Sequence, residues 1–81
     1  MNDARRTALH DELDTWASFV RARVVSGVGS EQYHESLGYA FGYAEARLDL
    51  GDPDGARSKI AWFRAEAERW QDHPDWPGRT A

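Results

Sequence analysis

The sequence predicts an all-α protein, either a three-helix antiparallel bundle or a helical hairpin plus a helix, followed by an extended, proline-anchored C-terminal tail. Three observations indicate this class. Apolar residues recur at three- and four-residue spacing in three segments, no window shows the alternation of a strand, and glycine or proline separates the segments. The 81 residues are expected to form one helical domain, 1–81, with a core that buries only about 60% of the unfolded chain's surface.

The first helix is predicted over residues 3–26. Asn2 or Asp3 is suited to cap its start, and Gly27, in the segment SGVGS, is suited to the left-handed position that follows a last helical turn. Its apolar residues fall on one helical face: Leu9, Leu13, Trp16, Val20 and Val24.

The second helix is predicted over residues 30–50, with Ser30 as its cap and Gly51 as its stop. Its main apolar stripe consists of Tyr33, Leu37, Phe41, Ala44 and Leu48.

The third helix is predicted over residues 53–72. Asp52 places an acceptor at the cap, and Pro53 takes the first helical position, where no backbone N–H is needed. Pro74 ends this helix at or before His73, so residues 73–81 form the tail. The stripe of the third helix is Ala56, Ile60, Phe63, Ala67 and Trp70.

Two segments resemble known proteins. GDPDGA resembles the tight turn inside a tetratricopeptide-repeat hairpin, where Gly51, Asp52 and Ala56 match small-residue positions, and this implies hairpin geometry only. The ending WQDHPDWPG, about a tenth of the chain, resembles the tails of small uncharacterised helical proteins of actinobacteria and their phages, and this implies no activity. Nine arginines and twelve alanines against one lysine, one isoleucine and one asparagine are typical of a GC-rich genome, such as that of an actinobacterium, its phage or a mobile element.

Composition and charge disfavour several classes of function. Without cysteine there is no disulfide framework or thiolate metal site. The net charge is −4, and residues 30–54 carry six acids against Arg47 alone, whereas nucleic-acid binding needs a basic face. The N-terminus has no apolar run after its arginines, and no stretch approaches the roughly 20 apolar residues that span a bilayer. We therefore expect a cytoplasmic protein that binds neither nucleic acid nor membrane.

A second apolar face distinguishes the middle helix. At 100° per residue, a set of side chains falls opposite its main stripe: Tyr39, Tyr43, Ala46 and Leu50. Gly38 and Gly42 lie beside this set, and each costs about 1 kcal/mol of helix stability relative to alanine. Glycines at a four-residue step let another backbone approach closely, which predicts a binding face.

The occupant of this face is left open by the sequence. A second copy in a homodimer or a host protein is one interpretation, a middle helix sandwiched between its two neighbours is another, and a plain surface is the third. Four acids flank the glycines, either as a solvated face or as a rim that selects an arginine-bearing partner: Glu31, Glu35, Glu45 and Asp49.

Trp62 lies off the stripe of the third helix, near Arg69. This is the composition of an interface hot spot if Trp62 is exposed. Alternatively, the tail folds back and covers Trp62 with Trp76.

Catalytic and metal-binding patterns are weak. Glu31 and His34 have the Glu-x-x-His spacing of di-iron bundles, which need two such pairs and two further glutamates, so a metal site would require a dimer. His10 and Asp14 lie one turn apart, and a surface hydrogen bond is expected between them. We therefore expect a non-enzymatic interaction module without a cofactor, self-associating and encoded by a phage or mobile element as an adaptor or inhibitor of a host protein. A carboxylate–histidine metal protein assembled across a dimer is the alternative.

Overall fold

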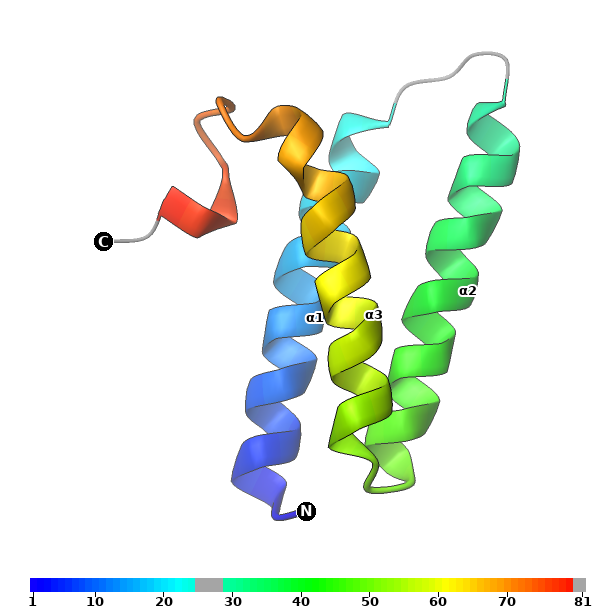
Figure 1. Ribbon diagram of the computed structural model, residues 1–81, viewed down its shortest axis with the longest axis vertical. Coiled ribbons are helices and arrows are strands. Elements are labelled where there is room, and N and C mark those ends of the chain that lie inside the picture. Colours follow the sequence, from blue (N-terminus) through cyan, green and yellow to red (C-terminus); the bar gives the residue numbers. More distant parts are fainter. Residues whose placement is uncertain (25–28, 80–81) are drawn as a thin grey trace.

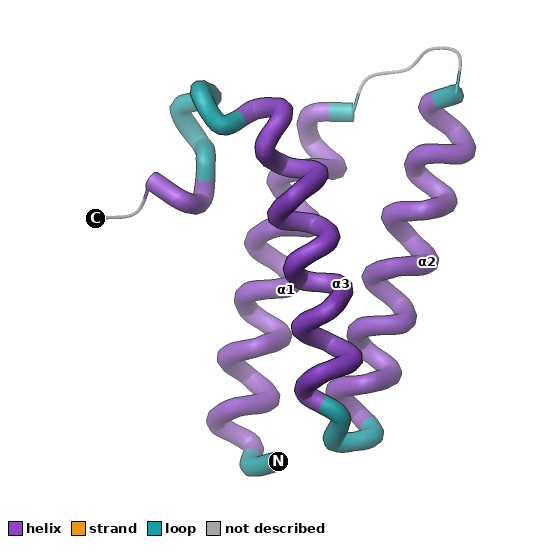
Figure 2. Tube along the Cα trace, viewed as in Figure 1, coloured by secondary structure: helices purple, strands orange, loops and turns teal. Residues whose placement is uncertain are grey.

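The predicted all-α class is confirmed by a computed structural model, which describes residues 1–24 and 29–79. These residues form three long helices, α1 (Asp3–Arg23), α2 (Ser30–Asp49) and α3 (Pro53–Ala67), and two 3-10 turns, η1 (Glu68–Trp70) and η2 (Pro77–Arg79). The long helices run up, down and up, and α3 contacts both of the others (Figure 1). Figure 2 shows helices and connections but no strand in the described part of the chain.

The core lies where the three predicted stripes meet. Leu13, Leu37 and Phe63, one from each long helix, are completely buried. The remaining buried side chains extend this core along the bundle: Leu9, Trp16, Ala17, Phe19, Val20, Ala40, Ala44, Leu48, Ala56, Ile60 and Ala67. No charged or polar side chain of the described residues is buried, so apolar packing holds the helices together.

The two ends of α1 agree with the prediction only in part. Asn2 caps the helix, and its side-chain oxygen accepts a hydrogen bond of 2.8 Å from the backbone N–H of Arg5. The helix ends at Arg23, before the predicted end, because Val24 is already extended and only its N–H still bonds back to Val20. The predicted role of Gly27 falls outside the described residues.

The start of α2 differs from the prediction. Gly29, with φ of +86°, occupies the cap position, and Ser30 is the first helical residue instead of the cap. A left-handed backbone favours glycine, so the chain turns into α2 one residue earlier than expected.

The connection between α2 and α3 follows the prediction closely. Gly51 adopts the left-handed conformation, with φ of +76°, directly after α2. Asp52 then caps α3 by accepting a 3.1 Å hydrogen bond from the N–H of Gly55, with Pro53 at the first helical position. The sharp reversal places α3 antiparallel to α2 (Figure 1).

The third helix is shorter than predicted. Its α-helical part ends at Ala67, and the turn that follows is the 3-10 helix η1. There the N–H of Gln71 bonds to the carbonyl of Glu68, a three-residue step that tightens the last turn before Pro74. The proline-anchored tail then crosses to α1, where Trp76 lies edge-on to Trp16 with the ring centroids 5.0 Å apart.

Candidate protein-interaction surface on α2 and α3

The side of α2 that faces away from α1 and α3 carries most of the predicted second apolar face. We define this outer face of α2 as Gly38, Tyr39, Gly42, Ala46 and Leu50, all of which are exposed. Tyr39 is 71% and Leu50 73% exposed, and with Met1 they are the large hydrophobic residues of the described chain that remain in solvent. The opposite side of the helix is buried, because Leu37, Ala44 and Leu48 pack into the core.

The sandwiched interpretation of α2 is wrong at the glycines. A methyl group added to Gly38 or Gly42 would meet no atom within 4 Å, so neither residue is required by a close contact within the described chain. The physical reason is that α1 and α3 both pack on the other side of α2, where its main stripe lies. The helix-propensity cost of the two glycines, about 1 kcal/mol each, is therefore not offset by intramolecular packing.

Tyr43 does not belong to the exposed face, contrary to the prediction. Its ring is partly buried beneath two cations, the guanidinium of Arg47 at 5.0 Å and the ammonium of Lys59 at 5.1 Å from the ring centroid. Four residues advance a helix by about 400°, so Tyr43 is turned some 40° from Tyr39 toward α3. This rotation is enough to bring it under the side chain of Lys59.

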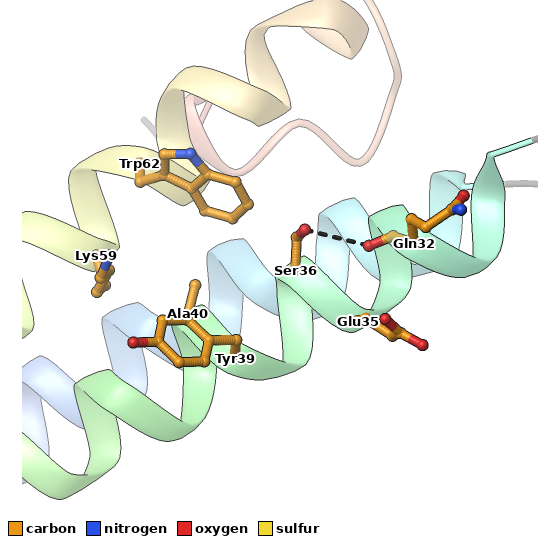
Figure 3. A pocket seen from close by; sticks show the side chains of 7 residues that line it. All are labelled: Gln32, Glu35, Ser36, Tyr39, Ala40, Lys59 and Trp62. Atoms are coloured by element: carbon orange, nitrogen blue, oxygen red, sulfur yellow. Dashed lines mark hydrogen bonds between the residues drawn. The ribbon is translucent and has the colours of Figure 1, made fainter.

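An open groove of about 490 Å³ runs between α2 and α3, with Tyr39 at its edge (Figure 3). Trp62 and Lys59 line it from α3, and Ala40 lies between the helices. The side chains from α2 complete the lining: Gln32, Glu35, Ser36 and Tyr39. Trp62 and Tyr39 therefore share a surface, which α2 and α3 form together.

Trp62 matches neither of its two predicted environments. Its side chain is partly buried and lies edge-on to Phe63, with the centroids 5.1 Å apart, while it faces the groove. The tail does not cover it, because Trp76 packs against Trp16 and Phe19 of α1 instead. The cation that shares the groove with Trp62 is Lys59.

Arg69 has a different role from the one predicted. Its guanidinium lies 5.4 Å from the ring centroid of Tyr33 and 3.7 Å from the carboxylate of Glu66. The hydroxyl of Tyr33 donates a 2.8 Å hydrogen bond to Glu66. The pKa of Tyr33 is raised to about 12, mostly by burial of the ring and further by the neighbouring carboxylate of Glu66. Arg69 thus stabilises the contact between α2 and α3 and is not aligned with Trp62.

The acids of α2 divide into two groups. Glu31, Glu35 and Asp49 are exposed, and none of them forms an ion pair with a described residue. Glu45 instead turns toward α1, where its carboxylate lies 3.4 Å from Nε2 of His10. The expected contact between His10 and Asp14 is confirmed, with Nδ1 3.4 Å from the carboxylate. The outer face of α2 therefore carries unpaired negative charge.

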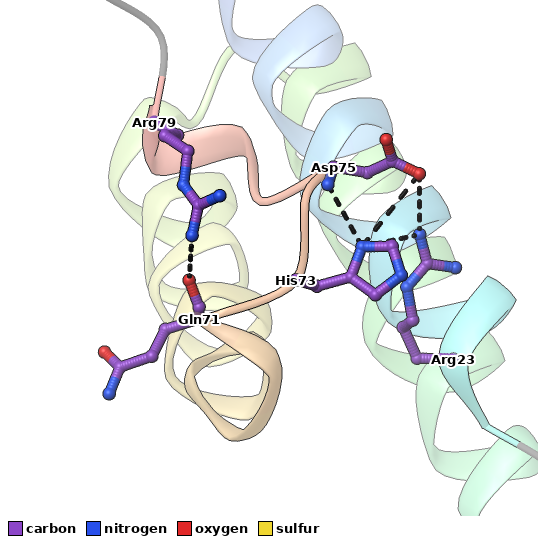
Figure 4. Close-up of polar contacts among 5 residues, drawn as sticks. All are labelled: Arg23, Gln71, His73, Asp75 and Arg79. Atoms are coloured by element: carbon purple, nitrogen blue, oxygen red, sulfur yellow. Dashed lines mark hydrogen bonds and ion pairs between the residues drawn. The ribbon is translucent and has the colours of Figure 1, made fainter.

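A polar cluster that the sequence did not reveal fixes the tail to α1 (Figure 4). Arg23 lies 3.1 Å from the carboxylate of Asp75, and the backbone N–H of Asp75 donates a 3.0 Å hydrogen bond to Nδ1 of His73. Arg79 bonds to the carbonyl of Gln71 at 3.2 Å. Residues 23 and 75 are 52 positions apart, and no local pattern pairs them. The sequence signal for a packed tail was Trp76 between Pro74 and Pro77, and it did not indicate α1 as the surface.

The metal alternative finds no complete site among the described residues of one copy. Glu31 and His34 are both exposed on the first turns of α2. Over residues 1–24 and 29–79, no three histidine, aspartate or glutamate side chains gather closely enough to hold an ion. A site assembled across a dimer stays a prediction.

Comparisons with known proteins identify no relative. No protein family, curated protein or solved structure matches the chain. Within the described residues, none of the helices combines the length and the apolar character that crossing a membrane requires. The resemblance of the tail to actinobacterial and phage proteins stays a prediction, and function is inferred from the chain's own residues.

Proposed function

We propose that this chain is a non-enzymatic protein–protein interaction module that self-associates through the outer face of α2. The observation that carries the proposal is the exposure of Tyr39 and Leu50, at 71% and 73%, on a helix whose other side is fully packed. Large apolar side chains that are grouped on one surface favour a docking site over a solvated one.

The two glycines support the same face. Gly38 and Gly42 weaken α2 and bring no packing benefit within residues 1–24 and 29–79, since a methyl group at either position would meet none of their atoms within 4 Å. Glycine has no side chain, so a helix of a second copy could approach the backbone of α2 closely at these two positions. Such a contact would offset the cost of the glycines.

The size of the domain adds a thermodynamic argument. A chain of 81 residues buries only about 60% of the surface that its unfolded form exposes, so its own core leaves a small stability margin. Binding of a second folded copy stabilises the folded state by mass action. Self-association would therefore contribute to stability as well as cover Tyr39 and Leu50.

Sedimentation equilibrium at tens of micromolar tests the proposal. We expect an average mass above the 9.2 kDa of one chain, rising with concentration. A Tyr39→Ala variant should return toward the monomer mass, whereas Arg5→Ala, an exposed change on α1, should not. A mass of 9.2 kDa for the wild-type chain throughout the concentration range would show that self-association is wrong and would leave the surface to a different protein, such as a host target.

A further inference from the structure

The groove between α2 and α3 has opposite charges at its two ends. In Figure 3, Lys59 and Glu35 lie on opposite sides of the aromatic pair formed by Tyr39 and Trp62. The groove thus presents a cation, two aromatic rings and an anion in order along its length.

Neither charge is neutralised within the described part of the chain. Glu35 is exposed and forms no ion pair there. Lys59 lies over the ring of Tyr43 at 5.1 Å but forms no ion pair with a carboxylate of the described residues. Both groups are therefore available to an external partner with opposite charges in the reverse order.

A second copy of the same groove meets this requirement. When two identical surfaces pair across a twofold axis, a residue on one side of the axis in one copy contacts the residue that lies on the opposite side of the axis in the other copy. An axis that crosses the groove between Tyr39 and Trp62 exchanges the two charged ends. We propose that two copies pair groove to groove, so that Glu35 of each copy contacts Lys59 of the other.

The centre of this contact has the composition of an interface core. Tyr39 and Trp62 lie close to the axis, where Tyr39 of each copy would face Trp62 of the other, and aromatic side chains at the centre of an interface carry much of its energy. The charged ends would lie on the rim and set the register. A pairing without the exchange would place Glu35 against Glu35 and Lys59 against Lys59, which repel. The inference rests on the proposed self-association and names its geometry.

Charge reversal with mixing tests this geometry. In Glu35→Lys both rim contacts become lysine against lysine, and in Lys59→Glu both become glutamate against glutamate. Each variant alone should self-associate about thirtyfold more weakly than wild type, because single rim ion pairs are weak but the reversal acts on two of them. Mixed in equal amounts, the two variants should form a heterodimer, since lysine at position 35 of one chain then meets glutamate at position 59 of the other and the second pair stays native.

Asp11→Lys is the matched control, because it makes the same change of charge at an exposed position of α1, outside both the groove lining and the outer face of α2. It should retain near-wild-type self-association and show no preference for either variant. If wild type dimerises while the reversals behave like this control and mixing restores nothing, groove pairing is wrong and self-association stands. A monomeric wild type would remove both proposals.

Discussion

The C-terminal half of α1 and the outer face of α2 both carry aromatic residues, yet the rest of the chain covers only the first. Trp16 and Phe19 are each 6% exposed, whereas Tyr39 is 71% exposed. The difference comes from the tail, which lays Trp76 edge-on to both α1 rings with centroids 5.0 and 5.8 Å away. No described segment performs the same role for α2.

Packing of the three long helices against one another does not cover every apolar side chain. Trp16 and Phe19 are covered by the tail, and the outer face of α2 stays exposed. Each helix buries one main apolar stripe, and α1 gains its additional cover from Trp76 of the tail, which polar contacts among Arg23, His73 and Asp75 also hold against α1. On α2, the additional surface is a place where another chain can supply what the tail supplies on α1. Two changes test this contrast and a third tests the packed side of α2, in order from the largest expected effect to the smallest.

Trp76→Ala should destabilise the fold by about 2–4 kcal/mol, because it uncovers Trp16 and Phe19 and removes a packed aromatic ring. The matched change on α2, Tyr39→Ala, should alter the free energy of unfolding by at most about 0.5 kcal/mol, because the removed ring is exposed. Denaturant midpoints measured at low protein concentration compare the two. Equal losses would mean that the tail and the outer face of α2 do not differ in the way described.

Gly42→Leu should have opposite effects on the monomer and on association. The monomer should gain up to about 1 kcal/mol from helix propensity, since a Cβ added there meets no described atom within 4 Å. Association should weaken by about 1–3 kcal/mol if a second copy approaches this backbone.

Thermal melts at two protein concentrations separate these effects, because only association makes the midpoint depend on concentration. Gly42→Ala should stabilise the monomer with less damage to association. A Gly42→Leu variant that melts higher at both concentrations and associates normally would place the glycines in solvent and contradict the role given to them.

Tyr33→Phe should change how stability depends on alkaline pH. The pKa of Tyr33 is raised to about 12 from 10.0, so the folded state holds this proton more tightly than the unfolded chain does. The resulting stabilisation is fully present below pH 10 and is lost as the pH rises through 12, and we expect about 1–2 kcal/mol for a ring that stays partly solvated.

Denaturant midpoints between pH 8 and pH 12 should therefore fall more steeply for wild type than for Tyr33→Phe. Glu66→Gln removes the carboxylate that accepts the hydrogen bond from the Tyr33 hydroxyl. The pH dependence of its denaturant midpoint should be intermediate between those of wild type and Tyr33→Phe. Parallel curves for wild type and Tyr33→Phe would show that Tyr33 does not titrate differently in the folded and unfolded states.

Local chemistry was sufficient to predict the helices and most of their inner faces. The stripes Leu9–Leu13–Trp16 and Ile60–Phe63–Ala67 are buried as their spacing requires, and Gly51, Asp52 and Pro53 end one helix and begin the next. Helix ends were less predictable. Cap preferences favour Ser30, but Gly29 takes the cap position because the chain enters α2 through a left-handed backbone conformation, with φ of +86°, that favours glycine.

The candidate surface was predicted in part. Gly38, Tyr39, Gly42, Ala46 and Leu50 lie exposed on one helix, as the periodicity implies. Tyr43 was misplaced because a rotation of about 40° separates the outer face from the edge that meets α3. Trp62 and Arg69 were misplaced because their neighbours lie on another helix. Tyr39 and Tyr33 belong to α2, and the spacing of residues within α3 does not show how α2 packs beside it.

The sequence by itself determined that the chain forms three helices, which residues face inward and where α2 turns into α3, because these depend on contacts within a few residues. Tertiary structure alone decided that the tail packs on α1, that Lys59 covers Tyr43 and that α2 and α3 form a groove with opposite charges at its ends. These contacts join residues far apart along the chain, and their geometry follows from how the helices pack against one another.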